Sequence, residues 1–175
     1  ELTFFGDMIK VEELKKSLEL NFNPSVIECF DISHLGGKNT TGSMVQFRNG
    51  KPDKSNYRRF KIQSYYGNDD FSGIYEVVKR RYKKLLEENK EFPDLIIIDG
   101  GKGQLSSAIK SLKELSLNIP IISIAKREEE IFVPGLEESI KLQEKNKALL
   151  FIREIRDEAH RFAINYNKLL RKKEI

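Results

Sequence analysis

The chain has 175 residues, of which 39% are hydrophobic and 33% charged, the balance of a globular protein rather than a disordered one. The length suits one domain, and apolar runs such as residues 95–98 are far too short to cross a bilayer. Residues 1–10 lack a basic start followed by an apolar stretch, and the single cysteine, Cys29, excludes an internal disulfide. We therefore expect a cytoplasmic protein that does not enter membranes.

The net charge of +4 is unevenly distributed along the chain. Residues 51–90 contain 11 basic and 6 acidic side chains, and residues 141–175 contain 10 basic and 5 acidic. Such asymmetry is expected where a polyanion binds one face, because each neutralised phosphate releases condensed counterions. Basic residues also keep helix surfaces soluble, so charge alone leaves nucleic-acid binding and simple solubility as two open interpretations.

The amino-terminal part predicts a short helix followed by three antiparallel strands. Apolar residues recur with charges between them before Asn23-Pro24, which indicates a helical linker over residues 1–24. The abrupt start suggests a piece of a longer protein. The predicted strands are residues 26–33, 43–48 and 55–62, separated by a loop at Gly36-Gly37 and a hairpin turn at Asn49-Gly50.

The rest of the chain alternates helices with strands. Residues 74–86 have apolar positions at helical spacing, and Pro93 stops that helix. The later predicted elements are a buried strand at 95–98, a helix at 103–115, a strand at 121–125, a weak hairpin at 130–142 and a long helix with an apolar stripe from 152 to 170. Right-handed crossovers arrange residues 25–175 as a mixed five-stranded sheet flanked by helices, which is the element order of the ribonuclease H fold.

Two aspartates are associated with the most apolar strands. Asp31 lies inside the first strand, where a buried carboxylate needs a metal, a base or hydrogen-bond donors. Asp99 ends the strand at 95–98, at the position where open sheets place their ligand sites. If the two strands are neighbours, both carboxylates meet at one edge of the sheet. Either aspartate alone is also typical of a turn at a strand end.

His160 lies beside the apolar stripe of the last helix and could be an ordinary, partly buried histidine. If the helix places it near the two aspartates, two carboxylates and one imidazole would bind a divalent ion with open positions for water and phosphate. Mg²⁺ or Mn²⁺ suits this set better than zinc, because the chain has only two histidines and no set of thiolates. Asp70 has two interpretations, a helix cap or a residue that reaches the same metal edge.

The glycine-rich segment at residues 100–103 does not carry a complete nucleotide-binding motif. The spacing of a Walker motif fails because position 96 is Ile and position 103 is Gly, and no third glycine completes a dinucleotide motif. A turn at a helix start with Lys102 remains suited to one phosphate of a nucleic-acid strand.

Further basic residues predict a surface that grips a nucleic-acid backbone. Arg58 and Arg59 are interleaved with aromatic residues that include Tyr65 and Tyr66, and Lys126 follows the strand that neighbours Asp99. A solvated strand face is the alternative interpretation for these charges.

Four segments together resemble the carboxy-terminal nuclease domain of UvrC, the incision subunit of bacterial nucleotide excision repair. They are Ile27-Glu-Cys-Phe-Asp-Ile-Ser-His34, Tyr57-Arg-Arg-Phe60, Leu95-Ile-Ile-Ile-Asp-Gly-Gly-Lys-Gly-Gln104 and Ile155-Arg-Asp-Glu-Ala-His-Arg-Phe162. The resemblance runs from about residue 26 to residue 170. It implies that Asp31, Asp99 and His160 form the active site and that Asp70 is a further functional aspartate. In ordinary ribonucleases H the position on the last helix is usually acidic, whereas the UvrC pattern requires the histidine found here.

The resemblance also implies a substrate and a partner. The domain would cut damaged double-stranded DNA on the 5′ side of a lesion, after UvrB has loaded at the damage. The first nuclease domain of the family, its cysteine-bearing segments, its UvrB-binding region and its helix-hairpin-helix module have no counterpart in this sequence. We therefore expect UvrB to act through regions outside this chain and the domain itself to be monomeric.

These observations predict a metal-dependent DNA endonuclease. Asp31 and Asp99 would hold Mg²⁺ or Mn²⁺, and His160 would complete the metal site or move a proton. The strand would be positioned by Arg58, Arg59, Lys102 and Lys126. Two alternatives stay open, namely a non-catalytic nucleic-acid-binding module with the same basic face, and a nucleotide-binding domain built on residues 100–103.

Overall fold

The centre of the fold is a parallel pair of strands, β1 (Val26–Leu35) and β5 (Leu95–Asp99), in a computed structural model that describes residues 2–35, 39–63 and 70–174. β2 (Asn39–Arg48) pairs antiparallel with β1, and β6 (Ile121–Ile124) pairs parallel with β5. The apolar run at 95–98 is fully buried, as a strand covered on both faces requires. The predicted central and parallel strands are therefore confirmed.

The sheet is mixed, as predicted, but it has more strands than five. In the described ranges it has seven, ordered β3-β2-β1-β5-β6-β7, with β4 (Arg58–Lys61) also paired to β2. The additional strands β3 (Lys51–Pro52) and β7 (Ile131–Phe132) have two residues each, too few to produce a visible sequence pattern. The turn at Asn49-Gly50 is confirmed, with the positive φ angles of 52° and 84° that a two-residue hairpin demands.

The strand predicted at residues 55–62 is shorter in the structure. Its first part is a 3₁₀ turn, η1 (Lys54–Asn56), and only β4 continues as a strand. The Asp53 carboxylate accepts hydrogen bonds from Ser55 Oγ at 3.1 Å and Asn56 Nδ2 at 2.7 Å, which stabilises the turn against extension. The loop at Gly36-Gly37 and the residues Tyr65 and Tyr66 lie outside the described residues.

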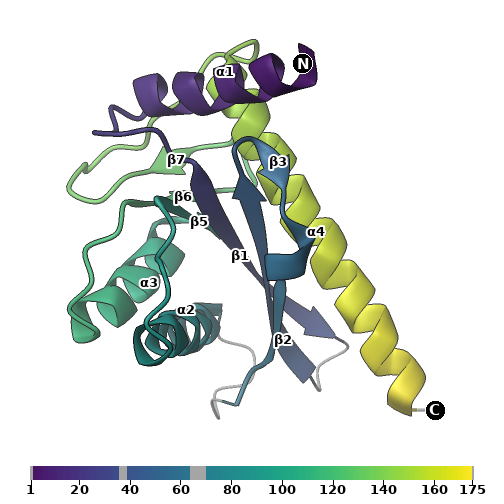
Figure 1. The fold of residues 1–175 in the computed structure, drawn as a ribbon. Helices are drawn as coiled ribbons and strands as arrows, with labels where there is room; N and C mark the ends of the chain where they lie inside the picture. Colours follow the sequence, from purple (N-terminus) through teal and green to yellow (C-terminus); the bar gives the residue numbers. More distant parts are fainter. Residues whose placement is uncertain (1, 36–38, 64–69, 175) are drawn as a thin grey trace.

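Helices cover both faces of the sheet (Figure 1). α2 (Asp70–Glu87) and α3 (Lys102–Glu114) lie on one face, and α4 (Lys147–Glu174) runs along the other. All three lie where the apolar periodicity predicts a helix. None of the helices among these residues is long and apolar enough to cross a membrane.

The amino-terminal helix α1 (Leu2–Ser17) packs against α4. Its Val11 and Leu14 are fully buried in the same apolar cluster as Cys29 and Ile152. The helix predicted in this segment is confirmed and contributes to the core on the α4 face. The division of the chain at residue 24 stays a prediction.

A buried polar network fixes which face of β1 each residue occupies. Glu28, 1% exposed, accepts hydrogen bonds from Arg81 Nη2 at 2.8 Å, Tyr82 OH at 2.8 Å and Gln46 Nε2 at 2.7 Å. Because a buried carboxylate is costly without such partners, this network holds the even-numbered side of β1 against α2. The odd-numbered side, which includes Asp31, consequently faces α4.

Candidate active site

The two aspartates singled out in the sequence come together on the α4 side of the sheet. The parallel register pairs Phe30 with Ile98, so Asp31 and Asp99 each follow a paired residue on neighbouring strands. Asp31 is 6% exposed and Asp99 is half-buried. Their convergence follows from the parallel pairing of β1 with β5, because parallel strands bring their carboxyl ends to one edge.

Burial makes both carboxyl groups resist ionisation, and the charge of Asp99 adds to this effect at Asp31. The pKa of Asp31 rises to about 6, first because the group is desolvated and then because the negative charge of Asp99 is near. Desolvation also raises the pKa of Asp99, while the positive charges of Lys126 and Arg156 oppose the rise. Such a pair favours binding of a cation, which would relieve the repulsion between the carboxylates.

His160 reaches the same place from α4. Ala159 and Ala163, on the same helix, are buried against the sheet, and this packing brings the half-exposed imidazole toward Asp31. The distance from His160 Nδ1 to Asp31 Oδ2 is 3.5 Å. The structure therefore brings His160 and the two aspartates together, although they belong to three separate elements.

The chemistry of this group suits a hard divalent cation. Asp31 Oδ2 is buried and has no hydrogen-bond partner besides the 3.5 Å approach of His160 Nδ1, which leaves this carboxylate oxygen able to accept a further ligand. Within residues 2–35, 39–63 and 70–174, no three His, Cys, Asp or Glu side chains are clustered closely enough to hold a metal ion by themselves. Mg²⁺ commonly binds through one or two carboxylates and completes its shell with water and substrate phosphate, which an incomplete protein shell permits.

Asp70 contacts His34, which lies near the end of β1. Asp70 is the first residue of α2, and its Oδ1 forms a short hydrogen bond with His34 Nε2. His34 Nδ1 in turn lies 3.1 Å from Thr40 Oγ1. Asp70 thus ties the start of α2 to the end of β1, and a direct role in catalysis stays a prediction.

The four basic residues predicted to position the strand differ in their surroundings. Lys126 is exposed and close enough to lower the pKa of both aspartates, whereas Lys102 Nζ contacts the carbonyl of Glu137 at 3.5 Å. Arg58 donates to the carbonyls of Ser55 and Tyr57 in its own loop. Of the four, Lys126 therefore lies in the electrostatic field of the aspartates.

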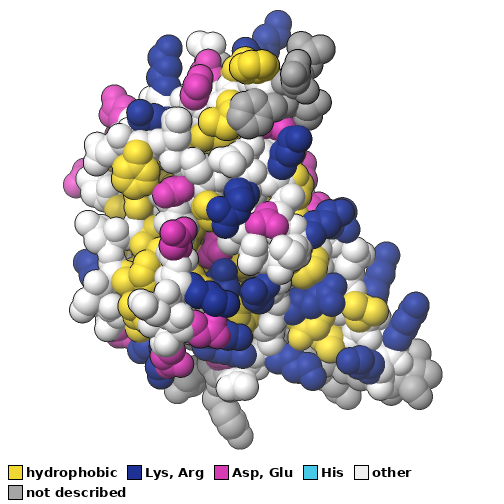
Figure 2. Space-filling model, viewed as in Figure 1, with side chains coloured by type: hydrophobic (Ala, Val, Ile, Leu, Met, Phe, Trp, Pro, Cys, Tyr) yellow, Lys and Arg dark blue, Asp and Glu magenta, His cyan; other side chains and the backbone are white. Residues whose placement is uncertain are grey.

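Arg59 is held in a different way. Its guanidinium lies over the rings of Phe162 and Tyr166 of α4, at 4.7 and 5.4 Å from the ring centres. Figure 2 shows Lys and Arg side chains gathered over β4 and the carboxy-terminal half of α4. This arrangement supplies a basic face with aromatic rings beside it, the combination used to hold a nucleic-acid strand.

Three residues on the α4 side of the sheet, at or near the aspartates, were not singled out in the sequence. Arg156 opposes the rise in the pKa of Asp99, and Ser43 is the direct cross-strand partner of Asp31. Asn167 joins α4 to the sheet by hydrogen bonds with Ser33 and Thr41. No local sequence signal marks Ser43 or Asn167, because their roles depend on the register of β1 with β2 and on the placement of α4.

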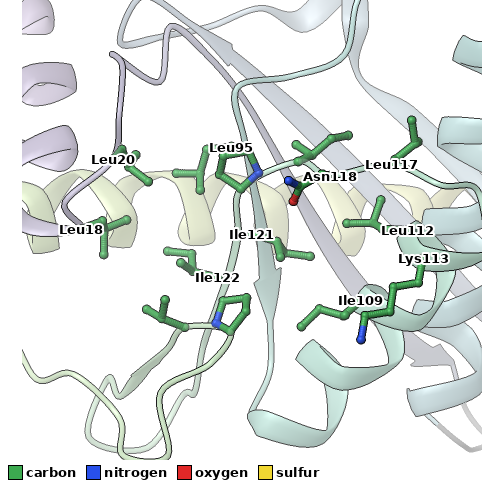
Figure 3. A pocket seen from close by; sticks show the side chains of 14 residues that line it. Leu18, Leu20, Leu95, Ile109, Leu112, Lys113, Leu117, Asn118, Ile121 and Ile122 are labelled. Carbon is green, nitrogen blue, oxygen red and sulfur yellow. The ribbon is translucent and has the colours of Figure 1, made fainter.

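An apolar cleft of about 380 Å³ lies elsewhere, near the amino end of β5 (Figure 3). Leu18, Leu95, Leu112 and Ile122 are among the side chains that line it. Leu95 begins β5 and Asp99 ends it, so the cleft is at the other end of the strand from the aspartates. Its lining is mostly apolar, with Lys113 and Asn118 as its polar side chains.

A mixed sheet with two carboxylates on its central strands, and a third polar side chain from the last helix, defines the class of ribonuclease-H-like nuclease domains. Residues 15–164 match the family described as the UvrC RNase H endonuclease domain. The chain belongs to that family, and the predicted fold and family are confirmed.

Curated relatives named UvrABC system protein C align over nearly the whole chain. The protein of Methanococcus maripaludis is 67% identical over 175 residues, which is 100% of this chain and 33% of the relative. The protein of Prosthecochloris aestuarii is 50% identical over 163 residues, 93% of this chain and 26% of the relative. The chain thus spans about a third or less of the length of these relatives.

Solved structures with a similar arrangement include human endonuclease V, at 17% sequence identity and a TM-score of 0.44. That similarity covers 65% of this chain and 49% of the other. The endonuclease V of Ciona intestinalis in complex with DNA gives 19% identity and a TM-score of 0.43, over 72% of this chain and 59% of the other. Similarities this low carry no argument about function.

Proposed function

We propose that this domain cuts DNA by metal-assisted hydrolysis of a phosphodiester bond, as the nuclease that incises 5′ to a lesion in nucleotide excision repair. The observation that carries the proposal is the buried Oδ2 of Asp31, which lies near Asp99 and has only His160 Nδ1, at 3.5 Å, as a polar partner. An oxygen in this state is suited to a cation and is costly without one. The family of UvrC RNase H endonuclease domains supports the same reaction.

The proposed ion is Mg²⁺ or Mn²⁺, held by Asp31 and Asp99 with His160 at the open side. When bound, such an ion supplies charge stabilisation to the phosphate and lowers the pKa of a coordinated water. The two carboxylates fix its place in the sheet, while the exposed imidazole of His160 holds or moves a proton beside the reacting phosphate. Products with 5′-phosphate and 3′-hydroxyl ends are expected for this class of site.

The strand would cross the α4 face beside the aspartates. Lys126 lies near both carboxylates, and Arg59 lies two strands away from Asp31 along the same row of cross-strand partners. Because neighbouring strands lie about 4.8 Å apart, Arg59 and Asp31 are separated by roughly 10 Å across the sheet. This distance corresponds to about two nucleotides of a DNA strand. Arg58 and Lys102 would add weaker contacts, because each already contacts a backbone carbonyl.

The test is the conversion of supercoiled plasmid to nicked circles with Mn²⁺, with and without EDTA. Asp31→Asn and Asp99→Asn should each abolish nicking while leaving the affinity for DNA within about twofold, since neither removes a positive charge. A variant that nicks at the wild-type rate would overturn the assignment of that aspartate.

The same experiment separates the alternatives. A non-catalytic binding module predicts salt-sensitive DNA binding that needs no divalent ion and no nicking under any condition. A nucleotide-binding domain predicts saturable ATP or GTP binding at residues 100–103, where Gly101 N already donates a hydrogen bond to Gln104 Oε1 at 3.0 Å. Incision at a lesion, rather than simple nicking, would in addition require UvrB and the regions of the longer relatives that lie outside this chain.

A further inference from the structure

Two successive rows of side chains on the α4 face of the sheet differ in how their hydrogen bonds are completed. In the antiparallel register of β1 and β2, Asp31 is opposite Ser43, and Ser33 is opposite Thr41. Side chains two residues apart on a strand point the same way, so both pairs face α4. We call the first pair, with His160 above it, the open row, and the second pair, with Asn167 above it, the closed row.

The closed row has a complete set of hydrogen bonds. Asn167 Nδ2 donates to Ser33 Oγ at 2.6 Å, and Thr41 Oγ1 donates to Asn167 Oδ1 at 3.0 Å. The amide thus serves one hydroxyl as a donor and the other as an acceptor. This is the expected state of polar groups that are removed from water.

The open row does not have a complete set of hydrogen bonds. His160 precedes Asn167 by two helical turns and approaches Asp31 at only 3.5 Å. Ser43 is 0% exposed, and its hydroxyl has no hydrogen-bond partner, like Asp31 Oδ2 across the strand pair. Ser43 Oγ is thus without a hydrogen-bond partner, and Asp31 Oδ2 has only the 3.5 Å approach of His160, so a ligand between the paired strands could serve both oxygens.

The chemistry of the two oxygens indicates what that ligand is. Directly opposite side chains in an antiparallel pair have Cβ atoms about 5 Å apart, so a single water can contact both. A carboxylate binds a hard cation directly, whereas a neutral serine hydroxyl is better suited to a water in the cation's hydration shell. The hydroxyl can donate to such a water or accept from it.

We propose that Ser43 is a positioning residue of the active site, whose hydroxyl binds a water ligand of the cation held by Asp31. The inference rests on the proposed function, because it requires a divalent cation at the aspartates. Ser43 holds the hydrated ion from β2, on the sheet face that α4 covers, and does not touch the reacting atoms. Outer partners of this kind commonly contribute about tenfold to metal affinity.

The experiment compares Ser43→Ala with Ser33→Ala, which makes the same chemical change one row away. Mn²⁺ affinity is measured by the electron paramagnetic resonance signal of free Mn²⁺, and thermal stability is measured without metal. Ser43→Ala should weaken Mn²⁺ binding about tenfold and leave the melting temperature unchanged or higher, because it removes a hydroxyl without a partner. Ser33→Ala should lower the melting temperature by about 3 °C and leave Mn²⁺ affinity within twofold.

A second substitution guards against a packing effect. Ser43→Cys keeps a side chain of similar size but lacks a strong hydrogen-bonding group, so a loss of Mn²⁺ affinity shared with Ser43→Ala belongs to the hydroxyl. Unchanged Mn²⁺ affinity in both variants would overturn the role of Ser43.

Wild-type protein and Asp31→Asn distinguish this failure from that of the proposed function. If the wild type binds Mn²⁺ and Asp31→Asn does not, only the inference about Ser43 is at stake. If the wild type binds no Mn²⁺, the metal-dependent reaction itself is wrong, and the role of Ser43 falls with it.

Discussion

The open and closed rows are built on the same two strands and beneath the same helix, yet only one of them is complete without a ligand. In the closed row the amide of Asn167 satisfies both hydroxyls below it. In the open row the imidazole of His160 approaches Asp31 Oδ2 at only 3.5 Å, and Ser43 Oγ has no hydrogen-bond partner. The closed row therefore stabilises the attachment of α4 to the sheet, and the open row gives up stability to keep a place for a cation and a phosphate.

The difference also explains why the site is built on regular elements rather than on loops. The closed row fixes α4 two turns beyond His160, so the imidazole keeps its position over Asp31 even though it is half-exposed. A change in the closed row should therefore act on folding, and a change in the open row should act on catalysis.

The largest expected effect comes from substituting the α4 residue above each row, His160 in the open row and Asn167 in the closed row. His160→Ala should reduce plasmid nicking by about 100- to 1000-fold, since it removes a group beside the reacting phosphate, with a melting temperature within about 2 °C of the wild type. Asn167→Ala should lower the melting temperature by about 3–6 °C, because two hydroxyls lose their partners. At a temperature well below unfolding, its nicking should remain within about threefold of the wild type.

The comparison breaks down if the effects are exchanged. A stable, inactive Asn167→Ala variant would mean that the closed row participates in the reaction. An active, destabilised His160→Ala variant would mean that His160 is a structural residue of α4.

A second prediction concerns the free energy of unfolding, which the buried carboxylate of Asp31 lowers when it is ionised. The pKa of Asp31 is about 6 in the folded chain, against about 3.9 for an unperturbed aspartate. Folding therefore takes up a proton in the window between about pH 4 and pH 6, and the folded state loses stability as the pH rises through it. Asp31→Asn removes that loss, so at pH 7.5 without metal it should be more stable than the wild type by about 2 kcal/mol.

Chemical denaturation at two pH values measures this effect. The advantage of Asp31→Asn should be present at pH 7.5 and should disappear below about pH 4, where the aspartate is protonated in both states. If Asp31→Asn were less stable than the wild type at pH 7.5, the ionised carboxylate would have stabilising partners within the folded chain. The description of the open row as incomplete would then be wrong.

The third prediction is the competition between protons and the cation. Because the pKa of Asp31 is about 6, lowering the pH through that value places a proton on the ligand oxygen. Mn²⁺ affinity should thus fall by up to about tenfold for each pH unit below 6 and be nearly constant above 7. Titrations at pH 5, 6 and 7.5 measure it, with Asp70→Asn as a control that should keep the wild-type profile. A profile without pH dependence would exclude Asp31 as a ligand.

The sequence predicts the local parts of this architecture and misses the parts created by pairing. The apolar runs around Asp31 and Asp99 identify two central strands, and the stripe on the last helix identifies α4, because each pattern lies within one segment. The nearness of His160 to these aspartates was available only from the resemblance to a family. Ser43 looks like any polar residue of a strand, and its importance arises from the register that places it opposite Asp31. The same holds for Asn167, whose partners are more than a hundred residues away.

The smallest expected effect is on DNA binding, and it concerns β4, the strand onto which both rows continue. On β4, Arg59 is the partner of Ser43 in the open row, and Lys61 is the partner of Thr41 in the closed row. Both are exposed, but Arg59 is held over two aromatic rings, and in the described part of the chain it forms no ion pair with a carboxylate. A preorganised, unneutralised guanidinium beside the cutting centre should hold one phosphate of the bound strand.

Arg59→Gln should therefore weaken DNA binding about fivefold and reduce the salt dependence of binding by about one ion, whereas Lys61→Gln should have less than half that effect. Fluorescence anisotropy at several salt concentrations measures both variants, with catalysis prevented by EDTA. Because the substitutions remove one charge each from neighbouring positions on the same strand face, equal losses would mean that only the overall charge of β4 matters. A larger loss for Arg59 would mean that the strand follows the open row across the sheet, from the aspartates on β1 and β5 to the aromatic rings of α4.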